Sequence, residues 1–480
     1  MAKWFSKLGF RGCSEWKNDG LELSTTSDEA AKLLDAAVAQ VTFEYVAMYE
    51  SSDYGGINGC CEKALDADPN FVMAKVFWYG MNVNRYNMSL PFADNAESAL
   101  KEMEQSAKSC GTERELMHVE AVMHYHEGQF VAACDVWNAI LEKYPTDMIA
   151  LKFLLDTFIY TSEWERFRDV VAKVLPAYPK HSPYKGYLVG FLGFGFEENR
   201  QLDRAESLLS RALELNPEDA WSTHGMAHVL EEKGNTKEGA EFLMKTESNW
   251  NICKMLACHN YWHLALFHIE NNNHDLALEI FDNTISKTAK GSGSVYANQD
   301  CSSLLKRLEL EGVSVGDRWD DLYEKYRLYA EEPIKGFPFA NLHLLINFMS
   351  TKESDTAQHF LNSLTEFSSY HHGTTATVMK EIGLNVCNFL VNYQYSQFSE
   401  AVDSLYPLRY HLRKIGGSRS QRDLFDQMLL HACYESENEQ HQKLGRMLLW
   451  QRKTMRPSSP LTDRLVVKYL SAHEGIPLVY

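Results

Sequence analysis

The sequence predicts an all-α fold in which antiparallel helix pairs stack into a solenoid, and two observations support this prediction. One is an internal period of 34 residues, with units that begin at Arg114, Met148, Gly186 and Ala220. The other is the composition, because 45% apolar and 12% aromatic residues in a chain of 480 can bury a long core. Each pair in such an array buries its apolar face against the next pair, so no second globular domain is needed.

The first unit, residues 114–147, has the clearest pattern. Its small, turn and large apolar residues stand at positions 8, 15, 20, 24 and 32, and these are Ala121, Gly128, Ala133, Trp137 and Pro145. Tetratricopeptide repeats carry these residue types at the same positions. The second unit is a weaker copy with Leu155, Phe167, Val171 and Pro179. The third unit follows a four-residue insertion and is close to the consensus, with Gly193, Ala205, Leu209, Ala212 and Pro217.

The remaining segments follow the same rhythm with a degenerate pattern. Residues 24–29 offer capping side chains before an alanine-rich helix. Helices are expected over residues 34–49, 57–67, 71–86, 96–110, 297–311, 319–331, 339–349, 355–367, 375–393, 400–414, 421–435 and 440–454, with a fifth unit from Cys258, a flexible loop over 287–294 and a turn at 457–460. We divide the chain into N-terminal helical repeats (1–111), a tetratricopeptide repeat core (112–285) and degenerate C-terminal repeats (286–480).

The net charge of the chain argues against polyanionic binding partners. A net charge of −18 and a pI near 5.5 oppose binding to nucleic acid or to anionic membranes, since both polyanions require a cationic surface. The chain shows no secretory signal and no apolar run of 18 residues. Its ten scattered cysteines, without a CxxC framework, predict free thiols. We therefore expect a cytoplasmic protein that binds neither nucleic acid nor a membrane.

Five segments distributed along nearly the whole chain resemble the tetratricopeptide repeat protein 38 family. They are LSTTS at 23–27, PTDM at 145–148, LACHNYWH at 256–263, LEGVSVG at 310–316 and SPLT at 459–462. The segment around His259 is specific to that family rather than to such repeats in general. The resemblance implies an all-helical intracellular repeat protein, and it supplies neither a substrate nor a catalytic residue.

The repeat register also predicts a binding groove. The first helix of each pair lines the concave face, and steps of three and four keep its residues on one side. The predicted groove residues are Tyr125, Lys152, Phe153, Asp156, Tyr160, Tyr187, Phe191, Phe194, Trp221 and Trp262. We expect Tyr187, Phe191, Trp221 and Trp262 to be more exposed than the core residues Trp137 and Phe196. Lys152 and Asp156 are spaced for an ion pair along one helix.

Two histidine pairs within this register predict a metal site. His224 with His228, and His259 with His263, are spaced four residues apart, as in helices that present two imidazoles to one metal ion. Neighbouring first helices run nearly parallel, so the two pairs face each other. Further candidate ligands or supporting groups are Glu231, Glu232, Asp300 and His343. Nitrogen and oxygen donors suit zinc, iron, nickel or copper.

These features leave two hypotheses for the function. The first is a scaffold that holds a peptide or protein partner in its concave, aromatic and histidine-lined groove. The alternative is a metal-dependent enzyme, or a metal-binding protein, that acts on a small molecule in a closed helical cup. Polar groove histidines that bind no metal are the simpler interpretation of the same residues. The sequence identifies neither the partner nor a catalytic residue, and whether the protein is an enzyme stays open.

Overall fold

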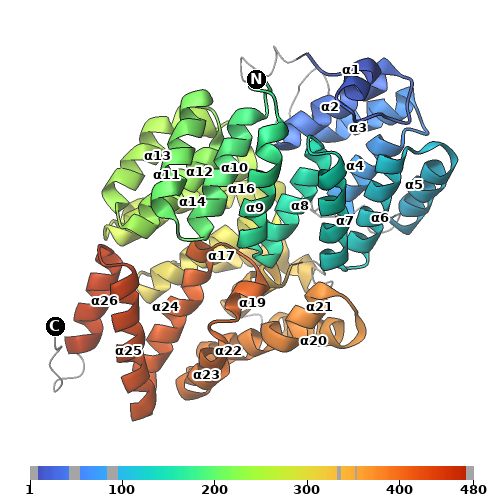
Figure 1. Cartoon of the computed structure of the whole chain (residues 1–480). Coiled ribbons are helices and arrows are strands. Elements are labelled where there is room, and N and C mark those ends of the chain that lie inside the picture. The colour runs from blue at the N-terminus through green and yellow to red at the C-terminus, as the bar shows by residue number, and fades with distance from the viewer. Residues whose placement is uncertain (1–8, 43–54, 84–95, 332–336, 352–353, 472–480) are drawn as a thin grey trace. The chain divides into compact units, whose positions relative to one another are not determined.

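The computed structural model describes residues 9–42, 55–83, 96–331, 337–351 and 354–471, and within these ranges the chain forms helices and no strand (Figure 1). The predicted all-α fold of stacked helix pairs is confirmed. The chain divides into two compact units. Unit 1 comprises Met1–Gly225, Ser248–Ala257 and Tyr370–Thr377, and unit 2 comprises Met226–Glu247, Cys258–Ser369 and Val378–Tyr480. Each is described by itself. The division of the sequence at residues 111 and 285 stays a prediction.

Unit 1 contains the N-terminal helices and most of the repeat core. Its helices are α1 (Cys13–Asn18), α2 (Asp28–Thr42), α3 (Gly56–Ala67), α4 (Val72–Val83), α5 (Ala96–Cys110), α6 (Glu113–His126), α7 (Phe130–Lys143), α8 (Met148–Thr161), α9 (Trp164–Val174), α10 (Lys185–Glu198) and α11 (Leu202–Leu215). The boundary between the units falls within α12 (Ala220–Lys233), which is one continuous helix. Most of α13 (Thr236–Trp250) and of α14 (Lys254–Glu270) lies in unit 2.

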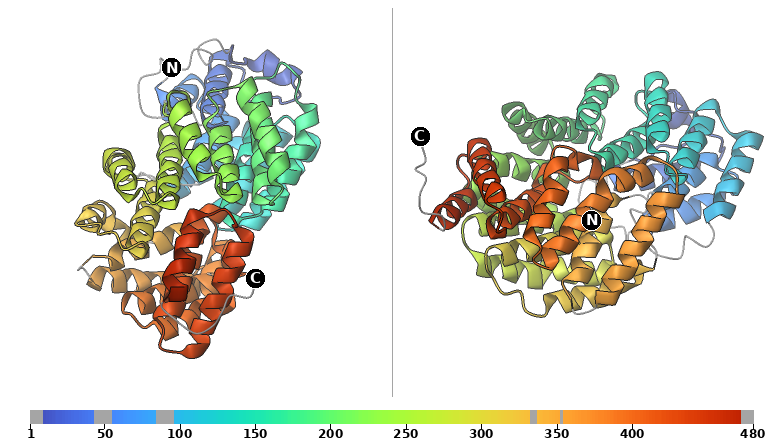
Figure 2. Two further views of the ribbon diagram at one scale, coloured as in Figure 1. Left: turned by 90° about the vertical axis from the view of Figure 1, so that its left-hand side faces the viewer. Right: turned by 90° about the horizontal axis from the view of Figure 1, so that it is seen from below.

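Unit 2 continues with further helices, several of which pack against α17. They are α15 (His274–Ile280), α16 (Ser286–Ser292), α17 (Val295–Leu310), α18 (Arg318–Tyr326), α19 (Pro338–Met349), α20 (Ser354–Tyr370), α22 (Leu384–Gln394), α23 (Phe398–Leu405), α24 (Arg419–Glu435), α25 (Glu439–Met455) and α26 (Pro460–Ser471). The short helix α21 (Thr374–Val378) lies almost wholly in the part of unit 1 that spans Tyr370–Thr377. Helix α17 contacts α19 and α24, while α25 packs between α24 and α26 (Figure 2). No helix among the described residues has both the length and the apolar composition needed to cross a membrane.

The register of the repeats agrees with the observed helices. The first helices begin at residues 113, 148, 185 and 220, within one residue of the predicted unit starts. Side-chain caps fix the starts of α6 and α8. Thr112 forms a capping box with Glu115 at α6, and the Asp147 carboxylate accepts hydrogen bonds from backbone amides of α8. Gly193 is small because α10 and α11 approach closely there: a Cβ would lie 2.8 Å from Leu209 Cγ.

Enlarging a small contact in the repeat core is expected to destabilise the protein. Ala133, Ala205 and Ala212 are fully buried, so replacement of any one by Leu overpacks the stack and lowers the free energy of unfolding by about 1–3 kcal/mol. Thermal melts measure the effect, and Ser207→Leu on the exposed side of α11 is the matched control. Unchanged melting midpoints in all three alanine variants would contradict the assigned register.

The structure corrects two expectations about secondary structure. Residues 287–294 are not a loop, because α16 continues to Ser292 and the break is confined to Gly293 and Ser294. Gly293 adopts a φ of +64° and ends α16, while the Ser294 side chain caps α17. The turn at 457–460 is followed by α26, a helix that the sequence pattern did not indicate. Residues 43–49 and 84–86, expected to be helical, lie outside the described residues.

Candidate metal centre

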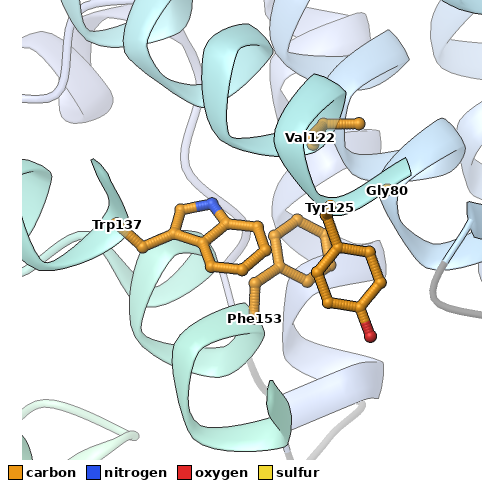
Figure 3. A pocket seen from close by; sticks show the side chains of 5 residues that line it. All are labelled: Gly80, Val122, Tyr125, Trp137 and Phe153. Carbon is orange, nitrogen blue, oxygen red and sulfur yellow. The ribbon is translucent and has the colours of Figure 1, made fainter. Parts of the chain in front are cut away.

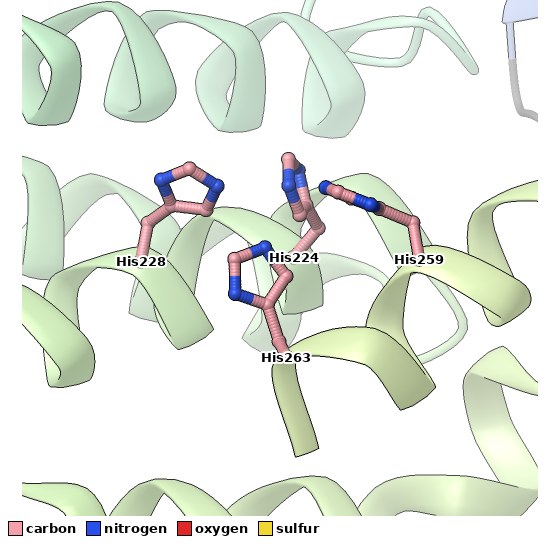
Figure 4. Close-up of side chains that lie close together, drawn as sticks. All are labelled: His224, His228, His259 and His263. Carbon is pink, nitrogen blue, oxygen red and sulfur yellow. The ribbon is translucent and has the colours of Figure 1, made fainter. Parts of the chain in front are cut away.

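Helices α12 and α14 bring four imidazole rings together (Figure 4). The spacing of four residues places His224 and His228 on one side of α12, and His259 and His263 on one side of α14. One ring nitrogen from each of the four lies within 4.8 Å of all the others. The ring centroids of His228 and His263 are 4.6 Å apart, and those of His259 and His263 are 4.9 Å apart. This four-histidine centre is therefore compact enough for its ring nitrogens to reach one ion.

The four-histidine centre is largely shielded from solvent. His228 and His263 are fully buried, His224 is nearly so, and the His259 side chain keeps 15% of its exposure. Burial lowers the pKa of His263 well below its ordinary value, and the neighbouring His228, His259 and Arg307 lower it further. His263 is consequently neutral at physiological pH. A neutral imidazole retains the lone pair that a metal ion requires.

Two carboxylates lie against the rings from the outside. Asp300 on α17 is hydrogen-bonded to His259, with 2.8 Å between Oδ1 and the ring Nδ1. Glu231 on α12 has its Oε2 atom 3.4 Å from Nδ1 of His263. Histidines that bind metals commonly donate their second ring nitrogen to a carboxylate, which fixes the ring and its tautomer. Asp300 and Glu231 therefore occupy supporting positions around the four-histidine centre.

Two of the other predicted residues have hydrogen-bond partners of their own. Glu232 accepts a hydrogen bond of 2.7 Å from Arg456 Nη2. His343 donates from Nδ1 to the carbonyl oxygen of Phe339 at 2.9 Å. Burial lowers the pKa of His343 to about 4, and its nitrogens are not among the four that come together. His343 is therefore not a member of the four-histidine centre, and a role of Glu232 beside the centre stays a prediction.

The predicted exposure of the groove residues is also wrong. Tyr187, Phe191, Trp221 and Trp262 are between 0% and 9% exposed, whereas Phe196 is only partly buried and lies beneath arginine side chains. The reason is that aromatic rings pack across neighbouring first helices. Tyr125, Lys152, Phe153, Asp156 and Phe194 are buried as well, and Tyr160 is half-buried. Lys152 and Asp156 do form the expected ion pair, at 2.6 Å, but in the interior.

Several of these predicted groove residues meet in two small hollows of unit 1. Tyr125 and Phe153 share one with Gly80, Val122 and Trp137 (Figure 3). The second is lined by Lys152, Leu155, Asp156, Ile159, Phe167, Phe191 and Trp221. Neither hollow has room for a water molecule. The side chains close on one another here and leave no open channel.

Sequence reasoning missed two arginines of unit 2, Arg307 and Arg456, that contact neighbours of the histidines. Arg307 on α17 lies with its guanidinium carbon 5.8 Å from the Trp262 ring and donates to the carbonyl oxygen of Ser420. Arg456, which follows α25, reaches back to α12 across 225 residues of sequence. No local pattern signals a contact at that separation, because the charge partners come from different helix pairs.

Comparison with known proteins adds a distant structural likeness. No protein-family model matches the sequence. A human IFIT1 dimer with m7Gppp-AAAA aligns over 94% of this chain and 96% of its own, with 14% identity and a TM-score of 0.39. A monomeric mutant of IFIT1 with Gppp-AAAA aligns over 97% of this chain and 98% of its own, with 14% identity and a TM-score of 0.38.

These matches correct the exclusion of nucleic acid. The matched IFIT1 structures are described as holding capped or triphosphate RNA. Our prediction that the charge of the chain excludes nucleic acid as a partner is therefore wrong. The net charge of −18 describes the whole chain, and a local cationic surface can differ from that average. The low TM-scores give no argument for any particular ligand, and we assign none from them.

Proposed function

We propose that this helical-repeat protein binds one transition-metal ion through His224, His228, His259 and His263. The observation that supports the proposal is the gathering of four ring nitrogens within 4.8 Å, supplied by two histidine pairs on two helices. Imidazole donors suit zinc, iron, nickel or copper. Four histidines around one ion form a closed site, whereas three leave a position for water or substrate. Binding is therefore the proposed function, and metal-dependent catalysis on a small molecule would require one of the four ligand positions to be open.

The charge around the four-histidine centre supports a cation as the ligand. Buried charged groups of unit 2 that contact one another or the histidines include Arg307, Arg452, Arg456, Asp300, Asp423, Glu231 and Glu232. These three guanidinium groups and four carboxylates together carry one net negative charge when the histidines are neutral. A bound cation offsets this excess, whereas a bound anion increases it.

The experiment that tests the proposal is the metal content of the protein. Protein prepared without affinity-tag histidines and without chelators is measured by mass spectrometric metal analysis, and about one ion per chain is expected. A content well below one ion, not restored by zinc, iron, nickel or copper, contradicts the proposal.

Binding of a peptide or protein partner is a second proposal. It is supported by the mixed aromatic and charged lining that Lys152, Asp156, Phe191 and Trp221 give to one hollow of unit 1. Trp221→Phe, which keeps an aromatic ring, is expected to weaken capture of a partner several-fold without unfolding the protein. Pull-down with wild-type and variant protein is the measurement, and equal capture would remove this surface from consideration.

We also propose a family and a cellular location for the protein. We propose membership of the tetratricopeptide repeat protein 38 family on the five segments that resemble it, of which LACHNYWH includes both His259 and His263. We also propose a cytoplasmic location. The ten cysteines are all free thiols, which supports a reducing compartment.

A further inference from the structure

The segment that follows α25 forms ion pairs with the C-terminal end of α12. Arg456 donates from Nη2 to Glu232 Oε1 at 2.7 Å and from Nη1 to Glu231 Oε1 at 3.5 Å. The Arg456 side chain is 10% exposed, and the two carboxylates are 6% and 2% exposed. Charged groups buried to this degree hold their partners in place, because either group left alone would be an uncompensated buried charge.

The same segment forms hydrogen bonds with the C-terminal end of α14. The Glu270 carboxylate accepts hydrogen bonds from Ser459 Oγ at 2.9 Å and from the Leu461 backbone amide at 3.0 Å. Arg464 donates to the carbonyl oxygens of Glu270 and Ile269, at 2.7 Å each. Residues 456–464, which we name the C-terminal clasp, therefore contact both helices that carry the histidines.

Glu231 connects the clasp to the four-histidine centre. One carboxylate oxygen, Oε1, faces Arg456 at 3.5 Å, and the other, Oε2, lies 3.4 Å from Nδ1 of His263. Resting on the metal-binding function proposed above, we infer that Arg456 is a positioning residue for that centre. It keeps Glu231 Oε2 beside Nδ1 of His263, 3.4 Å away, where a carboxylate can take up the Nδ1 proton and leave the other ring nitrogen as the donor to an ion.

This arrangement makes metal binding and docking of the clasp mutually dependent. If the clasp increases the affinity for the ion, the bound ion must stabilise the clasp by the same free energy. Outer-sphere partners of ligating histidines typically change metal affinity by 10- to 100-fold. The effect expected at Arg456 is of that order, although Arg456 itself contacts no histidine of the centre.

The first test is titration of full-length protein with Co²⁺, whose visible absorption reports the ligand geometry. Arg456→Gln is expected to raise the Kd by about 10- to 100-fold and to alter the absorption spectrum, and Arg456→Lys is expected to recover part of the affinity. Lys443→Gln removes the same charge from an exposed position on α25 and is the matched control, with no change expected. Equal Kd values and spectra for wild type and Arg456→Gln overturn the inference.

A second measurement needs no variant, so it stands even if Arg456→Gln fails to fold. Hydrogen exchange of the wild-type protein with and without Co²⁺ should show slower exchange in the clasp, residues 456–464, on binding, and unchanged exchange in α20 as an internal control. Unchanged exchange in the clasp of protein that binds Co²⁺ overturns this inference alone. Absence of Co²⁺ binding by wild type overturns the metal proposal together with the inference built on it.

Discussion

Replacement of both His228 and His263 by Gln is expected to reduce the metal content from about one ion per chain to nearly none. The two residues belong to different helices and are fully buried, and their rings lie 4.6 Å apart. Removing them takes away one donor from each histidine pair, and a glutamine amide is a much weaker ligand than an imidazole. Mass spectrometric metal analysis measures the loss, and circular dichroism measures whether the helices persist.

The chain offers a matched control for this double variant. His343 is as fully buried as His228 and His263, but its nitrogens are outside the group of four. His343→Gln should therefore retain the metal while suffering a comparable loss of buried imidazole packing. Equal metal loss in His343→Gln and in the double variant would show that general destabilisation, rather than ligation, accounts for the effect.

The four-histidine centre was predictable because it depends on two short-range regularities. A spacing of four residues fixes which side of a helix each histidine occupies, and the 34-residue period fixes which helices are neighbours. Together they placed His224 and His228 opposite His259 and His263 without any knowledge of the tertiary structure. Asp300 was found for a similar reason, since it lies on α17, which follows shortly after the fifth unit.

The exposure of the groove residues was not predicted correctly, although one signal was available. The first helices α8, α10 and α14 are apolar around most of their circumference, as in the run Gly190 to Phe196 of α10. A helix that is apolar all round is buried on all sides, whereas a helix lining an open groove carries a polar face. The repeat register says which side of a first helix a residue occupies, but it does not say whether other side chains cover that side.

The clasp could not be predicted at all. Its contacts join Arg456 to Glu232 and Leu461 to Glu270 over 224 and 191 residues of sequence, and no periodicity relates such positions. The turn at 457–460 was recognised from its prolines, but α26 after it was not. Long-range charge pairing depends on how far the helix stack curves, which is a sum of small rotations between successive pairs.

The second large effect is expected at Asp147, which begins α8 in unit 1. Its Oδ2 atom accepts hydrogen bonds from Arg114 Nη1 at 2.7 Å and from His118 Nε2 at 2.9 Å, and the group is fully buried. Asp147→Asn keeps an oxygen to cap the helix but leaves Arg114 as a buried charge without its partner. A loss of about 3–5 kcal/mol in the free energy of unfolding is expected from denaturant titration. Asp135→Asn, which affects the exposed pair with Arg166, should cost less than about 1 kcal/mol.

The same carboxylate makes stability depend on acidic pH. Burial by itself would raise the pKa of Asp147, but the charges of His118 and Arg114, with the hydrogen bonds from His118 and the Ala150 amide, hold it well below the usual 3.8. Because the folded-state pKa is the lower one, the unfolded chain binds more protons, so this contribution is present above the unfolded pKa and is lost as pH falls below about 5. The melting temperature of wild type should therefore fall more steeply between about pH 5 and pH 3 than that of Asp147→Asn. Parallel pH profiles for the two proteins would mean that the charge of Asp147 does not stabilise the fold.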